Sequence, residues 1–361
     1  WERAIAKARE VVDRLDNVTL NIAVTGETGA GKSSFVNAIR GVQDTDEGAA
    51  PTDVEECTMK PTMYPHPTMP NVKIWDLPGT GGTKVSYKYQ NYDFFIIVSA
   101  TRFKESEIML ANEIKKNKRK FYFVRTKTDF DVANEERKKV SEEATLQKIR
   151  NNCEDNLRIL GSPPVFLITS HDLERFDFHK LVNTLKSDLP DHKRYALVMS
   201  LPVYSMESLD RKYNTLKDTI WAVAFTSGAI SAVMPISSLF LVWNVPSVVD
   251  NLTKYYNAFS LDNKSLENMS QRVNKPIQAI LEEVKKSALV MAIAEKSSLE
   301  EKVKTRLGEE GVMEALFRLV PVAGNIASAR ASFVNTQSVL LEGVNELYSV
   351  AKRVIEMAEL K

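Results

Sequence analysis

The residues best suited to chemistry form a glycine-rich run near the start of the chain that fits the pattern G-x-x-x-x-G-K-[ST]. The run is Gly26-Glu27-Thr28-Gly29-Ala30-Gly31-Lys32-Ser33, followed by Ser34. In this pattern backbone N–H groups cradle phosphates, the lysine reaches the outer phosphates, and the next hydroxyl binds Mg²⁺. We therefore expect residues 27–34 to bind a nucleoside triphosphate, with Lys32 acting in catalysis and Ser33 as a metal ligand.

A second run, Asp76-Leu77-Pro78-Gly79, fits the D-x-x-G pattern that completes a triphosphate site. Its aspartate holds Mg²⁺ through a water molecule, and its glycine N–H meets the γ-phosphate. D-x-x-G by itself is also a common turn, but this one ends an apolar run at a plausible distance beyond the first motif. We assign Asp76 to the metal and Gly79 to catalysis.

A third run, Thr126-Lys127-Thr128-Asp129, indicates which base is bound. The carboxylate of Asp129 can accept hydrogen bonds from N1–H and the exocyclic amine of guanine, which adenine cannot supply. The stem of Lys127 is expected to lie along the base plane. By position alone, Thr169 and Ser170 are expected to offer backbone N–H groups to guanine O6. The predicted ligands are therefore GTP or GDP with Mg²⁺.

Apolar runs rich in β-branched and aromatic residues indicate the strands that position these motifs. They cover residues 18–24, 72–75, 93–100, 120–124 and 164–168. Helical periodicity recurs at 33–40, 106–117 and 140–160. The polar segment 44–70 is expected to be a functional loop with one edge strand. This alternation predicts an α/β domain with a mostly parallel, doubly wound sheet of six strands.

Strand patterns stop near Asp191, and long helical patterns follow it. These helices are expected at 205–233, 262–272, 276–296, 297–318 and 333–360. Residues 1–16 also form an amphipathic pattern, and we expect that helix to pack with the helical part. The predicted organisation is an N-terminal helix (1–16), a nucleotide-binding domain (17–190) and an all-α domain (191–361).

The segment 220–249 contains no charged residue and is long enough to cross a bilayer. It also carries serines, Asn244, Gly228, Pro235 and Pro246, which interrupt a membrane helix. Two interpretations stay open: a buried helical hairpin, which we favour, and an element that inserts into a membrane.

The composition argues against a nucleic-acid partner. The chain has 48 Lys and Arg residues and 47 Asp and Glu residues, a formal net charge of +1, so no basic field is indicated. The two cysteines, Cys57 and Cys153, match no metal-binding spacing and are typical of a reducing cytosol.

Taken together, the motifs resemble the interferon-inducible immunity-related GTPases over essentially the whole chain. The likeness rests on G-E-T-G-A-G-K-S-S, D-L-P-G, Y-D-F-F-I-I-V-S-A-T-R-F, F-Y-F-V-R-T-K-T-D and the helical remainder. It implies a Ras-like domain plus a helical domain built from both chain ends. It also implies a dynamin-like cycle, in which nucleotide-binding domains pair and hydrolyse GTP faster when assembled. Family members act in innate immunity, in the cytoplasm and peripherally on intracellular or pathogen-containing membranes, so self-association and a membrane surface are the expected partners.

The resemblance also implies a catalytic residue. Small GTPases place a glutamine just after D-x-x-G to orient water, but this chain has Thr80 there. In the family a glutamate of the preceding loop serves instead, and Glu56 falls at that place. Thr58, or less plausibly Thr52, would offer oxygen to Mg²⁺ and the γ-phosphate. The alternative is that Glu55 and Glu56 are solvated loop charges and that the protein is a nucleotide-gated scaffold with little hydrolysis.

Overall fold

A computed structural model describes residues 17–52, 60–79, 88–233, 237–309 and 324–359. Their contacts divide into two compact units. One unit is Val18–Leu201, and the other contains the described residues from Pro202 onward.

The nucleotide-binding unit is built on a six-stranded sheet with the order β2-β3-β1-β4-β5-β6. Its strands are β1 (Leu20–Gly26), β2 (Thr62–Pro65), β3 (Val72–Asp76), β4 (Phe94–Ser99), β5 (Lys120–Arg125) and β6 (Val165–Leu167). All these pairings are parallel except that of β2 with β3, which is antiparallel. Strand β2 is the edge strand, and it comes from the polar loop. The predicted mostly parallel sheet is confirmed.

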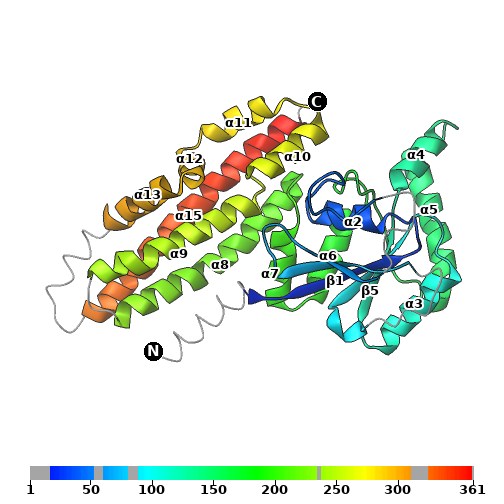
Figure 1. Cartoon of the computed structure of the whole chain (residues 1–361), viewed down its shortest axis with the longest axis horizontal. Helices are drawn as coiled ribbons and strands as arrows, with labels where there is room; N and C mark the ends of the chain where they lie inside the picture. The colour runs from blue at the N-terminus through cyan, green and yellow to red at the C-terminus, as the bar shows by residue number, and fades with distance from the viewer. Residues whose placement is uncertain (1–16, 53–59, 80–87, 234–236, 310–323, 360–361) are drawn as a thin grey trace. The chain divides into compact units, whose positions relative to one another are not determined.

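Two separate cores show that helices cover both faces of this sheet (Figure 1). One face packs against α2 (Lys32–Ile39), α6 (Phe178–Asp188) and α7 (Asp191–Ser200). The other face packs against α3 (Glu105–Lys116) and α5 (Glu142–Leu157). The remaining helices are α4 (Thr128–Glu136) and the 3₁₀ turns η1 (Tyr89–Asn91) and η2 (Arg158–Leu160). Every residue of β4 is buried, as expected of a central strand covered on both faces.

The parallel register brings the carboxyl ends of the strands together. Gly26 of β1 pairs with Val98 of β4, and Val98 in turn pairs with Val124 of β5. Loops that leave these ends therefore meet at one edge of the sheet, which is where open α/β sheets bind ligands. The three motifs leave β1, β3 and β5 at this edge.

The observed domain boundary differs from the one expected at residue 190. Helix α7 belongs to the nucleotide-binding unit, which extends to Leu201. Ala196 and Leu197 of this helix are buried in the core that also contains α2 and α6. The boundary at 190/191 was wrong because loss of strand pattern marks the end of the sheet but not the end of its covering helices.

In the part that the structure describes, the second unit contains helices and no strand, as predicted. Its helices are α8 (Met206–Val233), α9 (Ser237–Ala258), α10 (Asn263–Val273), α11 (Ile277–Lys285), α12 (Ala288–Ala294), α13 (Lys296–Glu309) and α15 (Gly324–Glu359). The expected helix 276–296 is two helices, because Ser287 caps α12 by accepting a hydrogen bond from Val290 N–H. Helix α15 begins at Gly324, earlier than the expected start at residue 333. No proline follows Pro321, so none interrupts the helix between these two positions.

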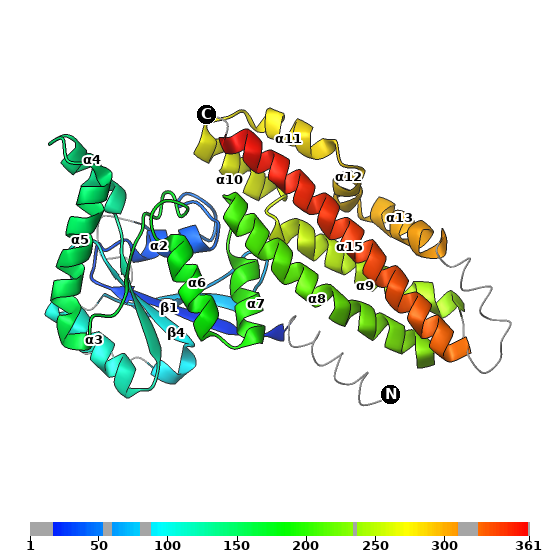
Figure 2. The same ribbon diagram turned by 180° about the vertical axis from the view of Figure 1, so that it is seen from behind.

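Helices α8, α9 and α15 lie side by side along the length of this unit (Figures 1 and 2). Two hydrogen bonds show that helices α8 and α15 run antiparallel. Tyr213 Oη donates to Asn345 Oδ1, and Tyr348 Oη donates to Asp210 Oδ1. Gly343 allows close packing of α15 on α9, since a Cβ there would lie 2.2 Å from Leu252 Cδ2.

The uncharged segment 220–249 is divided between α8 and α9, with Pro246 inside α9. Among the described residues, no helix combines the length and the apolar character that a membrane crossing requires. Side chains 227–244 are outside the described part, so burial of the hairpin stays a prediction. The expected helix 1–16 also lies outside the described residues.

Candidate functional site

The first motif forms the turn between β1 and α2. Gly31 precedes the helix with φ 83°, a left-handed conformation that suits glycine. Lys32 is the first residue of α2; its side chain is buried, and its Nζ donates to Glu27 O at 2.8 Å. The positive end of the helix dipole and the N–H groups of its first turn therefore face the loop, which makes this turn suitable for binding an anion.

Two of the three predicted metal residues meet beside this turn. Ser33 Oγ donates a hydrogen bond to Asp76 Oδ2 at 2.7 Å, and Asp76 is buried at the end of β3. A hydroxyl and a carboxylate are the oxygen ligands that Mg²⁺ prefers. The residues present thus fit Mg²⁺, which Ser33 and Asp76 would hold, as the sequence predicts.

The glycine of the second motif lies against the first motif. A Cβ at Gly79 would stand 2.7 Å from Thr28 Oγ1 and 3.0 Å from Thr28 N. Only a glycine lets the two loops approach this closely. The Gly79 N–H, which is predicted to meet the γ-phosphate, therefore lies beside the phosphate-binding loop.

A cavity of about 370 Å³ opens where the third motif meets the first. It is lined by Gly31, Ser34, Thr126, Lys127, Asp129, Phe130, Thr169, Ser170 and His171. The structure therefore brings all four predicted base-binding residues to one pocket, next to the phosphate-binding turn. Its volume is at the lower end of the range of small-molecule sites.

Asp129 supplies the most specific evidence in this pocket. Its Oδ1 is buried, and within the described residues no hydrogen-bond donor reaches it. A buried carboxylate oxygen without a donor is costly, so the site is completed by a ligand that brings N–H groups. Guanine offers two such groups on its Watson–Crick edge, so the pocket fits the predicted base.

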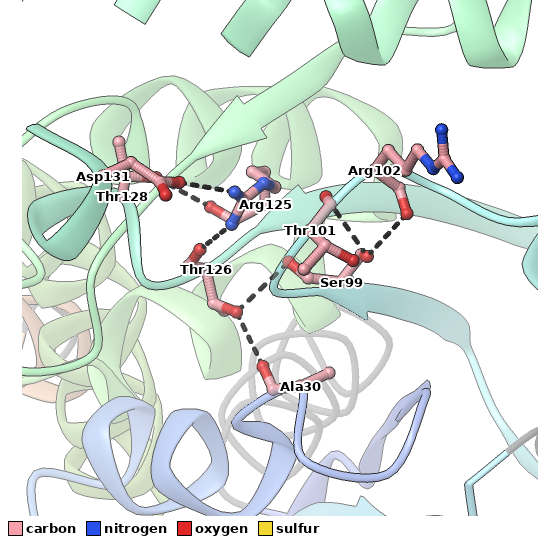
Figure 3. Close-up of polar contacts among 8 residues, drawn as sticks. All are labelled: Ala30, Ser99, Thr101, Arg102, Arg125, Thr126, Thr128 and Asp131. Carbon is pink, nitrogen blue, oxygen red and sulfur yellow. Dashed lines mark hydrogen bonds and ion pairs between the residues drawn. The ribbon is translucent and has the colours of Figure 1, made fainter. Parts of the chain in front are cut away.

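The base-binding loop is attached to the phosphate-binding loop by two side chains. Thr126 Oγ1 donates to Ala30 O at 2.6 Å and also lies 3.2 Å from Ser99 O of β4 (Figure 3). Lys127 Nζ donates to Gly29 O at 3.0 Å. These hydrogen bonds define the spacing between the two halves of the site.

Three residues of this site had no role in the prediction. Thr126 was part of the recognised motif, but only the fold shows that it bridges two loops. Phe130 is 56% exposed while lining the pocket, and its place directly after Asp129 was the only available signal. His171 follows the predicted Ser170 and carried no signal of its own.

The predicted loop residues Glu56 and Thr58 lie outside the described residues, as does Thr80. Their assignment to the attacking water and the metal stays a prediction. Thr52, the less favoured alternative, is described and exposed.

Helix α3 carries a buried carboxyl group, that of Glu107, next to the phosphate-binding loop. Glu107 is fully buried, and its Oε2 accepts a hydrogen bond from Lys104 N–H at 2.9 Å. Lys104 in turn forms an ion pair with Glu27 at 2.8 Å. Burial raises the pKa of Glu107 to about 7; the Lys104 N–H opposes this rise, and the Glu27 carboxylate adds to it.

This raised pKa predicts that the stability of the protein falls as the pH rises from about 4.5 to about 7. In that window the folded protein holds the Glu107 proton while the unfolded chain releases it, so unfolding becomes easier by up to about 3 kcal/mol. Glu107→Gln keeps the hydrogen-bond acceptor and should flatten this dependence. Urea unfolding midpoints at about pH 5 and about pH 7.5 measure it. The control is Glu113→Gln on the same helix, where the carboxylate is half exposed; equal pH dependence in the wild type and Glu107→Gln would refute the assignment.

Residues 2–346 match the model of the family described as Interferon-inducible GTPase (IIGP). The chain is similar to rat "Interferon-inducible GTPase 5", with 37% identity over 364 residues, covering 98% of this chain and 78% of the rat protein. It is also similar to mouse "Interferon-gamma-inducible GTPase 10", with 40% identity over 316 residues, covering 84% of this chain and 75% of that protein. Mouse "T-cell-specific guanine nucleotide triphosphate-binding protein 2" is 40% identical over 292 residues, which cover 76% of this chain and 69% of that protein.

Proposed function

The chain belongs to the interferon-inducible GTPase family, and on that premise we propose that it binds GTP with Mg²⁺ and hydrolyses it to GDP and phosphate. The observation that carries this proposal is the buried Oδ1 of Asp129, which no described donor reaches, in a pocket beside the phosphate-binding turn. Adenine has no N–H at position 1, so it would leave this oxygen without a donor.

The residues of the chain have separate roles in this reaction. The N–H groups of residues 28–33 and the ammonium of Lys32 bind the phosphates and stabilise the charge that develops on them. Ser33 and Asp76 would hold Mg²⁺, which would neutralise charge on the outer phosphates when bound. Lys127 and Asp129 bind the base and hold the phosphates in register with the turn.

We assign the attacking water to Glu56. The carboxylate of Glu56 would orient the water or accept its proton, because Thr80 has too short a side chain to replace the usual glutamine. Thr58 of the same loop would offer its hydroxyl to the metal.

Self-association and membrane association extend the proposal. Pairing of nucleotide-binding domains would organise the water-binding loop and so compensate for the missing glutamine. By family membership, we infer a cytoplasmic protein that acts in innate immunity, peripherally on intracellular or pathogen-containing membranes. Its partners would be a second copy of the chain and a membrane surface.

The decisive experiment measures GTP hydrolysis per protomer over about a hundredfold range of protein concentration. Specific activity should climb with concentration, because the competent species is an oligomer. Activity that stays constant while GTP is hydrolysed would refute assembly-dependent catalysis.

Glu56→Ala should abolish turnover and spare nucleotide binding, with a loss of at least about 100-fold in kcat. The matched control is Glu55→Ala, which removes the neighbouring carboxylate and should leave turnover within about twofold of the wild type. Single-turnover hydrolysis and nucleotide titration measure the two effects separately. Equal activity of both variants would remove Glu56 from the mechanism.

Thr80 favours a second candidate, a nucleotide-gated scaffold that binds GTP or GDP with little hydrolysis. In that case activity stays near zero at all concentrations while GTP still binds. The ordinary Gly31-Lys32-Ser33 motif favours the enzyme.

A further inference from the structure

Arg125, the last residue of β5, holds the base-binding loop from behind. Its side chain is only 8% exposed and makes two short contacts (Figure 3). Nη1 donates to Thr126 O at 2.5 Å, and Nη2 donates to Asp131 Oδ2 at 2.5 Å. The guanidinium therefore joins the start of the loop to the first turn of α4, and neither Arg125 nor Asp131 lines the base pocket.

The loop between these two contacts contains the base-reading residue. Lys127 has φ 56°, a left-handed conformation that is unfavourable for a lysine and must be held by its surroundings. Thr128 is buried, and its Oγ1 donates back to Arg125 O at 3.1 Å. Asp129 follows directly, so its position depends on how firmly residues 125–131 are held.

The same loop is held on its other side by neighbouring strand ends. Thr126 Oγ1 binds Ala30 O of the phosphate-binding turn, and Thr128 N–H donates to Ile168 O beyond β6 at 3.3 Å. These two bonds set the distance of the loop from its neighbours. The Thr128 hydroxyl and the Arg125–Asp131 pair both connect its beginning with the helix that carries Asp129. Of these two links the ion pair alone is charged, and an arginine that binds two acceptors at once defines orientation as well as distance.

We propose that the ion pair between Arg125 and Asp131 is a positioning element that aligns Asp129 with the Watson–Crick edge of guanine. This inference rests on the proposed binding of guanine nucleotides. It adds two residues that do not touch the base but determine how well it is read. Without the pair, Asp129 still lies in the pocket but no longer meets both N–H groups of the base at once.

The test is Asp131→Asn, which removes the charge of the partner that is 37% exposed and leaves Arg125 its contact with Thr126 O. Affinities for GDP and for inosine diphosphate are measured by titration at one salt concentration. Hypoxanthine has N1–H but no exocyclic amine, so the ratio of the two affinities reports whether Asp129 accepts both hydrogen bonds. We expect GDP affinity to fall about tenfold, with a smaller loss for inosine diphosphate, so that the ratio shrinks.

The controls separate positioning from simple support of the fold. Glu142→Gln alters a similar pair, since Glu142 lies in the first turn of α5 and accepts from Arg175 Nη2 at 2.5 Å. It should leave the ratio unchanged. Asp131→Glu keeps the charge and should restore much of the affinity ratio. If the pair had a purely structural role, Asp131→Asn would lower Tm and leave the affinity ratio unchanged. Arg125→Met provides a second variant with the same expected change.

The outcomes distinguish the two proposals. If the wild type prefers GDP to inosine diphosphate and Asp131→Asn keeps the full preference, the positioning role is refuted while guanine binding stands. If the wild type does not prefer GDP to ADP, the proposed guanine-nucleotide function fails, and the positioning inference fails with it.

Discussion

Replacing Asp129 by asparagine is expected to exchange the base preference of the protein from guanine to xanthine. The carboxylate accepts from two donors, N1–H and the exocyclic amine, whereas an amide offers one acceptor and one donor group. Xanthine matches that pair, because it has N1–H and a carbonyl at position 2. Loss of two hydrogen bonds to a charged group should weaken GTP binding by about 100-fold or more.

Titration with GDP and xanthosine diphosphate measures this exchange. The variant should bind xanthosine diphosphate at least as tightly as it binds GDP, with little change in Tm, because Asp129 Oδ1 has no described donor to lose. Asp155→Asn is the control, since that carboxylate is exposed on α5 and is not among the residues that line the pocket. Unaltered GDP affinity in Asp129→Asn would show that the base is read elsewhere.

The second large effect is expected from Gly26→Ala, which should prevent stable folding of the nucleotide-binding unit. Gly26 has φ +140°, and a Cβ there would lie 1.9 Å from Val98 O. That oxygen belongs to the backbone of β4, the strand paired with β1, so no side-chain rotation can relieve the clash. Separation of the two central strands should cost at least about 4 kcal/mol.

Gly29→Ala is a matched control in the same turn. Gly29 also has a positive φ, +76°, but a Cβ there would meet nothing within 4 Å. Only the conformational penalty applies, about 1 kcal/mol. Soluble yield and Tm of the two variants should therefore differ strongly, and similar values for both would contradict the close approach of β1 and β4.

The sequence by itself determined the phosphate-binding half of the site. Phosphate recognition depends on local backbone conformation. A phosphate-binding turn between a strand and a helix can therefore be identified from a short glycine-rich stretch of sequence. The buried parallel strands were also predictable, because their apolar runs are continuous. The base motif could be placed as well, since it directly follows one of these runs. The edge strand β2 was expected from its loop, but its antiparallel pairing was not.

The extent of the helical cover was less predictable. The boundary at residue 190 placed α7 in the wrong unit, and the helix expected at 276–296 is interrupted by the cap of Ser287. Amphipathic periodicity shows that a helix buries one face, but it does not say which partner covers that face.

Only the tertiary structure decided how the residues of the base pocket are positioned. The bond from Thr126 to Ala30 joins residues 96 positions apart, and it exists because parallel strands bring their carboxyl ends together. The burial of Glu107 and the two contacts of Arg125 likewise depend on which chain segments surround them. A pattern of residue types specifies the groups that a site contains. Their alignment and their pKa values follow from contacts between distant segments, which only the folded chain creates.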